Sequence, residues 1–427
     1  MSTQMTAERS ASRLLPDGQA PEDLDAHLRR FGPKPAVDAG VLVQALDESG
    51  LRGRGGAAFP TGTKWRAVMS RTPGGESVVI ANAAESEPAS FKDRTLLTVR
   101  PHLVLDGLEL AAEAVHARRA IVYMSRAHAD VQQRLLAAIA ERRRHADSGV
   151  FIEIVAGPNR YVAGEETAVT ARVSGRLAKP RVVPPRPFQR GVDGLPTLVQ
   201  NVETLAHAAL IARYGAAWFR SAGTPKTPGT TLLTATGAVG TTGVVEADAT
   251  MTVAEIVARS GGATGEPAAV LVGGYFGRWV VADSIWNQTI DVDALRSTGA
   301  TLGAGVLAVL PVAACGVTET DRVLTYLAGQ TAGQCGPCHV GLPAIAETFH
   351  KVAIGTARPP ALDLLARWAT DVLGRGACRH PDGAMLFLAS ALHVFAADLR
   401  HHVRSGVCRF SGQAPLLPVP DSEAGWW

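Results

Sequence analysis

The sequence has few aromatic residues, and its charges nearly balance. Phe, Trp and Tyr together make up 5% of the 427 residues, although hydrophobic residues as a whole make up 46% and charged residues 19%. These last two values are ordinary for globular domains. The chain has 42 basic and 39 acidic residues and a formal charge of +3, so it lacks the overall positive charge expected of a nucleic-acid-binding protein. Any basic site must therefore be local.

Cysteine is also scarce, and long apolar runs are missing. The five cysteines are too few and too unevenly spaced for a disulfide framework, and the pair Cys335-x-x-Cys338 suggests metal or redox chemistry instead. The N-terminal segment mixes acids with bases and has no apolar run, so a cytoplasmic location is expected. The longest uncharged stretch, Ser297–Thr318, contains Gly303, Gly305 and Pro311, which suits buried strands and a loop better than a membrane span.

Strand-like and helix-like patterns alternate in the first half of the chain. Short β-branched runs at Ser77–Asn82, Ala120–Met124 and Val150–Val155 predict strands, and Leu103–His116 and His128–Arg144 carry helix-period apolar positions between them. This alternation predicts an α/β domain with a largely parallel sheet. Ligands of such sheets bind at the carboxyl ends of the strands, where glycine loops lead into helices.

The rest of the chain changes character twice. Pro228–Leu310 has the order strand, strand, helix, strand, with Thr252 as a helix N-cap and Gly261 and Gly262 ending that helix. Its aromatic residues Tyr275, Phe276 and Trp279 suit a small core or a contact surface. From Thr318 onward the pattern is helical, most clearly at Ala384–Arg404. No internal repeat is evident.

A glycine-rich segment, GLRGRGGAAFPTGTKW at residues 50–65, is the first candidate site. Its glycines allow a close approach of backbone N–H groups to phosphate oxygens, and Arg52, Arg54 and Lys64 add positive charge. Taken alone, the segment is compatible with a phosphate-bearing cofactor, with a solvated surface turn, or with an arginine–glycine segment that binds RNA.

Four further motifs narrow this choice. They are ANAAESEPASFKDR (81–94), YVAGEETAVTARVSG (161–175), GLPTLVQNVETL (194–205) and QCGPCHVGL (334–342). Together with the glycine-rich segment, their order and spacing resemble the flavin-carrying, NADH-oxidising subunit of respiratory complex I and its relatives in soluble hydrogenases and formate dehydrogenases. The resemblance covers roughly residues 45–405. Five ordered motifs make the RNA-binding and surface-turn alternatives remote.

The resemblance implies a fold and a division into domains. The expected fold class is α/β, with a Rossmann-like FMN-binding domain followed by a ubiquitin-like β-grasp (SLBB) domain and a C-terminal helical bundle that carries an iron–sulfur motif. The expected boundaries are a partly helical N-terminal extension at 1–45, the FMN-binding domain at 46–226, the SLBB domain at 227–315, the helical iron–sulfur domain at 316–410 and a C-terminal tail at 411–427.

The resemblance also assigns roles to individual residues. The residues expected to hold FMN are Gly53, Arg54, Gly55, Gly56, Lys64, Asn82, Glu85, Gly164, Glu165, Asn201 and Thr204. Those expected around the nicotinamide donor are Phe59, Glu87, Tyr161, Glu166 and Arg186. The metal ligands are expected to be Cys335, Cys338 and Cys378. No side chain acts as a nucleophile or general base in this scheme, because the flavin performs the hydride chemistry.

The iron–sulfur motif departs from the family pattern. That pattern is C-x-x-C-x-x-C followed by a distant fourth cysteine, and its first position is Ala332 in this chain. Three thiolates leave several outcomes open: a [4Fe–4S] cluster with a substitute ligand, a three-iron [3Fe–4S] cluster, or an empty site. Because His339 and His380 are close in sequence, a Cys₃His zinc site is a further alternative. Cys315 and Cys408 are also available, although Cys315 matches a cysteine that is no ligand in the family.

The donor and flavin pockets depart from the pattern as well. Two of the three family phenylalanines that stack on adenine are replaced, by Ala67 and Arg186, while Phe59 is kept. We expect weaker NADH binding, by about ten- to a hundredfold, and Arg186 could pair with the 2′-phosphate of NADPH. Ala84 stands where the family has an aspartate in the flavin pocket, and Val183 replaces a basic residue.

The sequence thus predicts a divergent oxidoreductase subunit. Electrons would pass from NADH or NADPH through FMN and an iron–sulfur centre to a partner, such as a ferredoxin-like or other electron-transfer subunit, with membrane contact only through partners and no nucleic acid. Two alternatives remain at this point. One is a non-catalytic scaffold subunit that has lost both sites, and the other is an FMN-only protein with a structural zinc.

Overall fold

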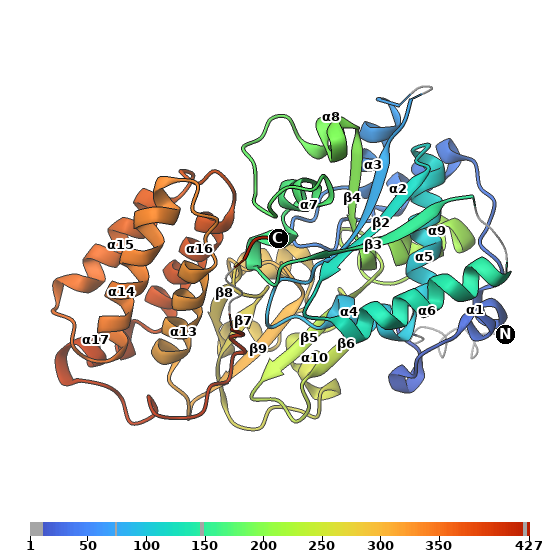
Figure 1. Cartoon of the computed structure of the whole chain (residues 1–427). Helices are drawn as coiled ribbons and strands as arrows, with labels where there is room; N and C mark the ends of the chain where they lie inside the picture. Colours follow the sequence, from blue (N-terminus) through green and yellow to red (C-terminus); the bar gives the residue numbers. More distant parts are fainter. Residues whose placement is uncertain (1–11, 73–74, 146–148, 422–424) are drawn as a thin grey trace, which may run out of the picture.

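A computed structural model describes residues 12–72, 75–145, 149–421 and 425–427 of the chain (Figure 1). The predicted N-terminal extension is therefore followed from residue 12, and its residues 1–11 lie outside the described residues. In Figure 1 an α/β region, coloured blue to green, lies at one end of the molecule, and a helical region, orange to red, lies at the other. A second sheet, coloured yellow to light orange, lies between them.

The first sheet has four parallel strands in the order β3-β2-β1-β4. They are β1 (Val78–Ala83), β2 (Arg119–Ser125), β3 (Phe151–Gly157) and β4 (Thr197–Asn201). The three strands expected from the apolar runs are confirmed as β1, β2 and β3, with ends that differ by one or two residues. Because β1 and β4 pair in parallel with Asn82 opposite Asn201, two polar side chains meet at the carboxyl edge of this sheet.

Helices cover this sheet. They are α1 (Leu24–Phe31), α2 (Ala39–Ser49), α3 (Thr61–Met69), α4 (Lys92–Val99), α5 (Pro101–Ala114), α6 (Ala129–His145), α7 (Glu166–Val173), α8 (Pro187–Arg190) and α9 (Val202–Arg220), with short 3₁₀ turns at Asp17–Gln19, Tyr161–Gly164 and Val192–Gly194. Nearly all of α5 is buried, and it crosses α9 where a Cβ on Gly107 would overlap the Leu205 carbonyl. The helices expected at 103–116 and 128–144 are confirmed as α5 and α6.

The second sheet has five strands in the order β6-β5-β9-β7-β8. They are β5 (Thr230–Gly237), β6 (Gly243–Asp248), β7 (Pro267–Val272), β8 (Arg278–Val281) and β9 (Val306–Pro311), with α10 (Val253–Arg259), α11 (Ala282–Ile285) and α12 (Val292–Ser297). The pair β5 and β9 is parallel, and the other pairs are antiparallel. This is the strand order of a β-grasp fold. Thr252 caps α10 in a capping box with Glu255, as its position before the helix predicts.

The helical region contains α13 (Gly316–Gly329), a π-helical turn at Pro337–Gly341, α14 (Leu342–Ala353), α15 (Pro360–Val372), α16 (His380–Val394) and α17 (Ala396–Ser405). The single helix expected at Ala384–Arg404 is wrong, because the chain bends by 78° between α16 and α17. The apolar pattern continues through the bend, where the Phe395 ring packs on Gly316 of α13. Among the described residues no single helix could span a membrane; only the bent pair α16 and α17 meets the length and composition test.

Aromatic side chains of the second sheet join it to the helical region. Trp279 is buried, and its ring contacts Phe387 and Phe395, with centroids 6.3 and 5.3 Å away. Tyr275 is also fully buried. Of the two roles expected for these residues, a small core or a contact surface, the burial of Tyr275 and Trp279 shows the core role.

The C-terminal segment after α17 runs back across all three regions (Figure 1). The Leu417 N–H donates to Glu319 of α13 at 3.0 Å, and the Tyr275 hydroxyl donates to the Pro418 carbonyl. Further on, the Ala178 N–H donates to the Trp426 carbonyl at 2.8 Å. The last residues therefore fasten the helical region to both sheets.

Candidate functional site

The glycine-rich segment forms a closed loop before α3. Arg52 pairs with Pro60 across the loop, and the Gly53 N–H donates to the Phe59 carbonyl at 2.8 Å. Gly56 has φ 103°, a conformation that a residue with a Cβ rarely adopts. The glycines are thus needed to turn the backbone tightly.

This loop lies on the N-terminus of α9, at the carboxyl edge of the first sheet. The Arg54 N–H donates to Thr204 Oγ1 at 2.9 Å, and a Cβ on Gly55 would lie 3.4 Å from the Cβ of Asn201. Asn201 caps α9 by accepting from the Glu203 N–H. Backbone N–H groups and a helix N-terminus therefore meet at one place, which favours an anionic group.

A buried charge cluster lies beneath the loop. Lys92 Nζ is 2.6 Å from Asp93 Oδ1 and 2.9 Å from Glu203 Oε2, and Asn201 Nδ2 donates to Asp93. Burial alone lowers the pKa of Lys92, but the charges of Asp93 and Glu203 outweigh it, so the pKa rises. Burial raises the pKa of Glu203, but the charges of Lys92 and Arg54 lower it by more, so the pKa falls overall. Lys92 and Glu203 are therefore charged, and Glu203 also pairs with Arg54 of the loop at 3.7 Å, whereas burial raises the pKa of Asp93.

Lys92, Asp93 and Glu203 were not among the residues expected at the site. All three lie inside two of the motifs that carry the resemblance, in the segments FKDR and QNVET. An additional signal was available, because charged residues inside apolar segments need partners when they are buried. Their buried positions show that paired charged side chains form the carboxyl edge of the first sheet beneath the glycine-rich loop.

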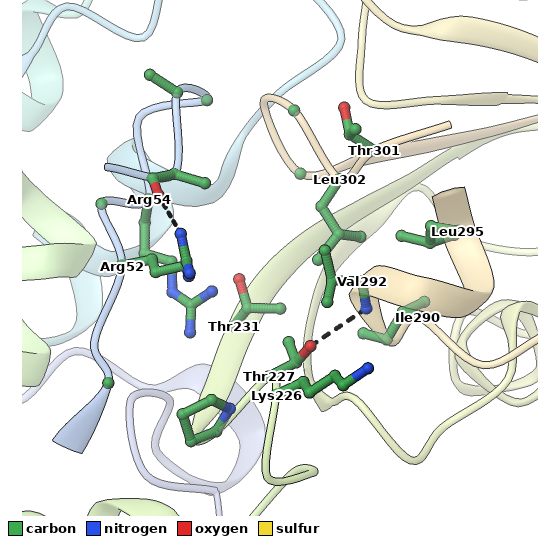
Figure 2. Close-up of a pocket in the computed structure, with 18 of the residues that line it drawn as sticks. Arg52, Arg54, Lys226, Thr227, Thr231, Ile290, Val292, Leu295, Thr301 and Leu302 are labelled. Atoms are coloured by element: carbon green, nitrogen blue, oxygen red, sulfur yellow. Dashed lines mark hydrogen bonds between the residues drawn. The ribbon is translucent and has the colours of Figure 1, made fainter. Parts of the chain in front are cut away.

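A cavity of about 760 Å³ opens beside the loop (Figure 2). Figure 2 shows Arg52 and Arg54 on one side and Ile290, Val292 and Leu295 on the other. Its cationic lining residues are Arg52, Arg54, Lys92, Arg220, Lys226 and Arg296. The volume lies within the range of small-molecule sites, and these cations outnumber the lining carboxylate of Asp293, which pairs with Lys226, so the charge suits phosphate. The residues present therefore fit a phosphate-bearing cofactor with an apolar part.

Only some of the predicted flavin residues line this cavity. Gly53, Arg54 and Gly56 do so. Gly55, Asn201 and Thr204 belong to the contact between the loop and α9 described above. The remaining five, Lys64, Asn82, Glu85, Gly164 and Glu165, lie along the ends of β1, α3 and the turn before α7.

Asn82, Gly164 and Glu165 form one part of that edge. Asn82 Nδ2 donates to the Gly164 carbonyl at 2.8 Å, and a Cβ on Gly164 would lie 2.9 Å from Ser86 Oγ. Glu165 caps α7 by accepting from the N–H groups of the next turn, and burial raises its pKa. Ala84, in the same place, is buried and offers no acceptor. The backbone here is therefore held close without the family aspartate.

The carboxyl group of Glu85 accepts hydrogen bonds at the N-terminus of α4. Glu85 has φ 38° and accepts from the N–H groups of Asp93 at 2.8 Å and Arg94 at 3.1 Å. Burial and the nearby charge of Asp93 raise its pKa to about 7. Its carboxyl group is thus engaged by a helix N-terminus.

The predicted donor residues fall into two groups. In the first, Glu166 lies between two cations, with Lys64 Nζ at 3.1 Å and Arg186 Nη1 at 3.7 Å. The Arg186 side chain is 59% exposed, and Phe59 is 52% exposed. This group therefore faces solvent with both signs of charge and one free aromatic surface.

The second group, Glu87 and Tyr161, is buried. The Tyr161 hydroxyl donates to Glu87 Oε2 at 2.7 Å, and the Tyr275 N–H from the second sheet donates to the same oxygen at 2.8 Å. Burial raises the pKa of Glu87 to about 7 against the opposing effect of these donors. The pair thus lies at the junction of the two sheets.

An aromatic cluster leads from this pair to the cysteine motif. The Tyr161 ring is 4.6 Å from Phe276, 5.8 Å from His380 and 6.2 Å from Tyr326, measured between centroids. Nε2 of His380 is 2.8 Å from the Leu327 carbonyl, and burial lowers the pKa of His380 to about 4. His380 is therefore neutral and is part of this cluster.

The three predicted thiol ligands come together near the start of α16. Cys335 Sγ and Cys338 Sγ are 3.4 Å apart. Burial raises the pKa of Cys378 to about 11, with smaller contributions from the charges of Cys338, Glu165 and Cys335. Cys378 lies two residues before α16 and is close enough to the other two thiols for their charges to act on it. Ala332 is buried and supplies no fourth sulfur.

The spacing of these thiols bears on the zinc alternative. Tetrahedral zinc, with Zn–S near 2.3 Å, requires all its sulfur ligands within about 4 Å of one another. Among the described residues, Cys335, Cys338 and Cys378 do not form a group with every sulfur within 4.8 Å. At least one sulfur is therefore too far away for these three thiols to hold a zinc ion as they stand, whereas the 3.4 Å between Cys335 Sγ and Cys338 Sγ lies within the zinc limit.

Two family models match the chain. The Nuo51 FMN-binding domain matches residues 46–209, and the NADH-ubiquinone oxidoreductase-F iron–sulfur binding region matches residues 318–402. Residues 46–209 carry the glycine loop and the first sheet, and residues 318–402 carry the three thiols. The two models thus cover both predicted cofactor regions.

Curated relatives are similar over most of their length. One of them, the second F subunit of the NADH-quinone oxidoreductase of Rhizobium meliloti, is 31% identical over 380 residues, which cover 86% of this chain and 90% of the relative. The F subunit of the NADH-quinone oxidoreductase of Mycobacterium tuberculosis is 32% identical over 389 residues, covering 88% of this chain and 87% of the relative.

Solved structures are similar as well. The NAD⁺-reducing [NiFe]-hydrogenase in the H₂-reduced state matches with a TM-score of 0.80 and 32% identity over 92% of this chain. The same hydrogenase in the air-oxidised state matches with a TM-score of 0.78 and 34% identity over 87% of this chain. This chain spans 67% and 63% of those two hydrogenase chains, respectively.

Proposed function

The chain belongs to the family of the FMN- and iron–sulfur-binding F subunits of NADH-quinone oxidoreductase, and from that membership we propose that it passes electrons from a reduced nicotinamide to a protein acceptor. FMN and an iron–sulfur centre are the cofactors of this transfer. Bound FMN accepts a hydride and releases its electrons singly. The relatives are named as oxidoreductase subunits, which supports electron transfer over the scaffold alternative.

One observation carries the proposal: the turn that leads into Glu165 packs against the start of α16, which follows Cys378. The Tyr161 ring of this turn lies 5.8 Å from the His380 ring, measured between centroids, and His380 is two residues after Cys378. Electron transfer between two centres requires that they lie close together. This contact supports a short path from the proposed flavin site to the three cysteines, which come from distant parts of the sequence.

The FMN phosphate is proposed to bind where the glycine loop meets α9. The glycine loop bends over the N-terminus of α9, which Asn201 caps, and the cations Arg54 and Lys92 lie there, paired with Glu203. Asn82, Gly164 and Glu165 are proposed to contact the rest of the cofactor. Glu85 and Lys64 complete the proposed set.

The donor is proposed to approach over the exposed group formed by Phe59, Lys64, Glu166 and Arg186. Phe59 offers a free ring for adenine, and Arg186 offers a cation for a 2′-phosphate or a second stacking surface. Glu87 and Tyr161 are proposed to line the inner end of this site. We expect NADPH to compete with NADH more strongly than in relatives that keep the family phenylalanines.

The partner is proposed to be a ferredoxin-like or other electron-transfer subunit. The domain boundaries proposed are 1–45, 46–226, 227–315, 316–410 and 411–427, and the second sheet with β-grasp order fits the SLBB unit. A cytoplasmic location is proposed as well, because all five cysteines are free thiols.

Anaerobic purification of the full chain tests the proposal. We expect flavin absorption bands, bound iron and sulfide, and bleaching of the flavin by NADH or NADPH in single-turnover mixing. The variant Cys338→Ser should lose the iron–sulfur electron paramagnetic resonance signal and keep flavin bleaching. A colourless protein with neither flavin nor iron would overturn the proposed function.

A further inference from the structure

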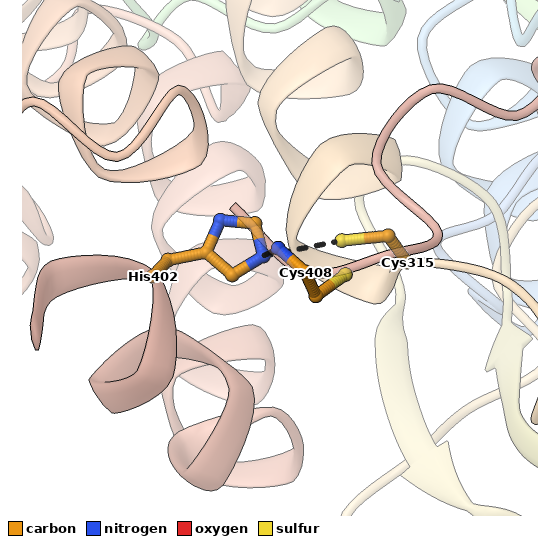
Figure 3. Close-up of side chains that lie close together, drawn as sticks. All are labelled: Cys315, His402 and Cys408. Carbon is orange, nitrogen blue, oxygen red and sulfur yellow. Dashed lines mark hydrogen bonds between the residues drawn. The ribbon is translucent and has the colours of Figure 1, made fainter. Parts of the chain in front are cut away.

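A second group of metal-ligating side chains lies outside the proposed cofactor sites (Figure 3). Cys315 is the residue before α13, His402 belongs to α17, and Cys408 follows α17. Their ligand atoms all lie within 4.8 Å of one another. Figure 3 shows the His402 ring directed at the two sulfur-bearing side chains.

The hydrogen bonds of His402 fix its tautomer. Nδ1 is 2.9 Å from the Ala353 carbonyl, which can only accept, so Nδ1 carries the proton. Nε2 accepts from the Cys408 N–H at 3.3 Å and therefore presents a lone pair. A carbonyl that orients the far nitrogen of an imidazole is the usual support of a metal-binding histidine.

The distance between the ligand atoms matches metal coordination. Cys315 Sγ lies 3.6 Å from His402 Nε2. With Zn–S near 2.3 Å and Zn–N near 2.0 Å, a tetrahedral zinc places these two atoms about 3.5 Å apart. Cys315 Sγ also accepts from the Thr318 N–H at 3.4 Å, at the N-terminus of α13, where negative charge on sulfur is favoured. The pair already has the geometry of two ligands.

The remaining positions around such an ion are also supplied. Cys408 gives a third ligand, and Ser411 Oγ lies 3.4 Å from Cys408 Sγ and 3.9 Å from Cys315 Sγ. Cys315 and His402 are buried, whereas Cys408 and Ser411 are partly exposed. Solvent therefore reaches one side of the group, where Ser411 or a water completes the coordination and the ion enters.

We propose that Cys315, His402 and Cys408 bind one divalent, thiophilic cation, for which Zn²⁺ has the best-matched ligand preference. Binding releases the thiol protons to solvent and displaces the long Cys408 N–H contact from His402 Nε2. The ion joins the N-terminus of α13, the last turn of α17 and the start of the C-terminal segment. Its role is structural, and it does not depend on the proposed electron transfer.

Cobalt titration of the full-length protein tests this site. We expect one equivalent of Co²⁺ with the visible bands of tetrahedral coordination and a sulfur-to-cobalt charge-transfer band. Cys408→Ser should lose this equivalent, and it preserves side-chain size at a partly exposed position. Val407→Ser changes the neighbouring residue, which is 51% exposed, and this variant should still bind one equivalent of Co²⁺. Cys335→Ser removes a thiol of the proposed iron–sulfur motif, and this variant should also bind that equivalent of Co²⁺.

Thermal unfolding gives an independent measurement. Zn²⁺ should raise the unfolding midpoint of the wild type and of Cys335→Ser, and it should leave that of Cys408→Ser unchanged. Equal cobalt binding by wild type and Cys408→Ser would overturn the proposal. A second result would also overturn it. This result is a Cys315–Cys408 disulfide in the purified protein, detected by intact mass after alkylation, together with no cobalt binding after the disulfide is reduced.

Discussion

Ala332 is buried at the position where the family has its first cluster thiol. With three thiolates, one iron of a four-iron cluster lacks a cysteine ligand and is the first to be lost on oxidation. We therefore predict that mild oxidation of the wild type releases iron and produces a three-iron resonance signal. Ala332→Cys should keep four irons per cluster under the same treatment, as measured by iron analysis and electron paramagnetic resonance.

Ala332→Ser is the control for that substitution. It adds a side chain of nearly the same size but no thiolate, so it should lose iron as the wild type does. If the wild type resists oxidation as well as Ala332→Cys does, another residue supplies the fourth ligand and the prediction fails.

Glu87 leads to a prediction about pH. Its pKa in the folded protein is raised to about 7 from an ordinary value of 4.5, so the folded state binds the proton more tightly than the unfolded state does. The contribution of Glu87 to stability is complete below pH 4.5 and is lost as the pH rises through 7. The unfolding free energy of the wild type relative to Glu87→Gln should fall by up to about 3 kcal/mol between pH 5 and 8.

Chemical denaturation at a series of pH values measures this difference. Glu85 is shifted in the same direction and remains in both proteins, so only the difference between the two proteins reports on Glu87. Parallel stability profiles for the two proteins would show that Glu87 titrates normally.

Arg186 tests donor choice. Arg186→Phe restores an aromatic surface that relatives use for adenine, which should be worth about 1 kcal/mol. We expect the NADH concentration for half-maximal flavin reduction to fall by roughly fivefold to tenfold, while that for NADPH rises because a cation is lost. Rapid mixing with each nucleotide measures both, and identical shifts for NADH and NADPH would contradict a role in selectivity.

The roles of single residues could be predicted where a local motif contains them. They could not be predicted where they depend on contacts between segments that are distant in sequence. The glycine loop, the cysteine pair and the Thr252 cap follow from local sequence. That Glu87 accepts from the Tyr275 N–H does not, because Glu87 follows β1 of the first sheet and Tyr275 follows β7 of the second. The charge cluster of Lys92, Asp93 and Glu203 was missed because it forms only where α4 packs against α9.

Among the elements, α5 and α9 cross closely because Gly107 has no side chain. A Cβ there would overlap the Leu205 carbonyl, which belongs to the backbone and cannot move aside cheaply. Gly107→Ala should therefore lower the unfolding free energy by about 1–3 kcal/mol. Gly329→Ala is the matched control at the end of α13, where nothing lies within 4 Å of the added methyl group. It should be neutral or raise stability by up to about 1 kcal/mol.

Urea unfolding of both alanine variants measures these changes. Equal effects at the two glycines would show that the helices can separate to accept the methyl group, and the close crossing would then carry no energetic weight.

Elements were predictable where apolar pattern and structure coincide. The central strands β1 and β2 of the first sheet are buried on both faces and therefore stand out as short apolar runs. The bend between α16 and α17 was not predictable, because apolar periodicity runs through Phe395 without a glycine or proline. The bend is imposed by packing against Gly316, which comes from a distant part of the chain.

At the scale of the whole molecule, the C-terminal segment holds the regions together. Leu417 is 2% exposed, and its N–H donates to Glu319. Leu417→Ala should cost about 2–4 kcal/mol by leaving a cavity and should speed proteolysis within residues 409–427. Trp427→Ala, at a residue that is 56% exposed, should change both measurements little. Comparable protease sensitivity of the two variants would contradict a fastening role.

The order of regions along the chain could be predicted from the order of motifs. Their mutual contacts could not, because they join segments that are distant in sequence. The Cys315, His402 and Cys408 group is the clearest case: no spacing rule connects these residues, and only the packing of α13, α14 and α17 brings them together.

The contacts of the glycine loop have a consequence for biosynthesis. The loop is synthesised early, but the residues that support it come much later: Thr204 bonds to Arg54, and a Cβ on Gly56 would lie 3.7 Å from the Gly303 carbonyl. A nascent chain on the ribosome therefore lacks a finished pocket until the second sheet has emerged. Flavin loading must follow synthesis of most of the polypeptide, and a ribosome-bound fragment that ends before β9 should not retain FMN.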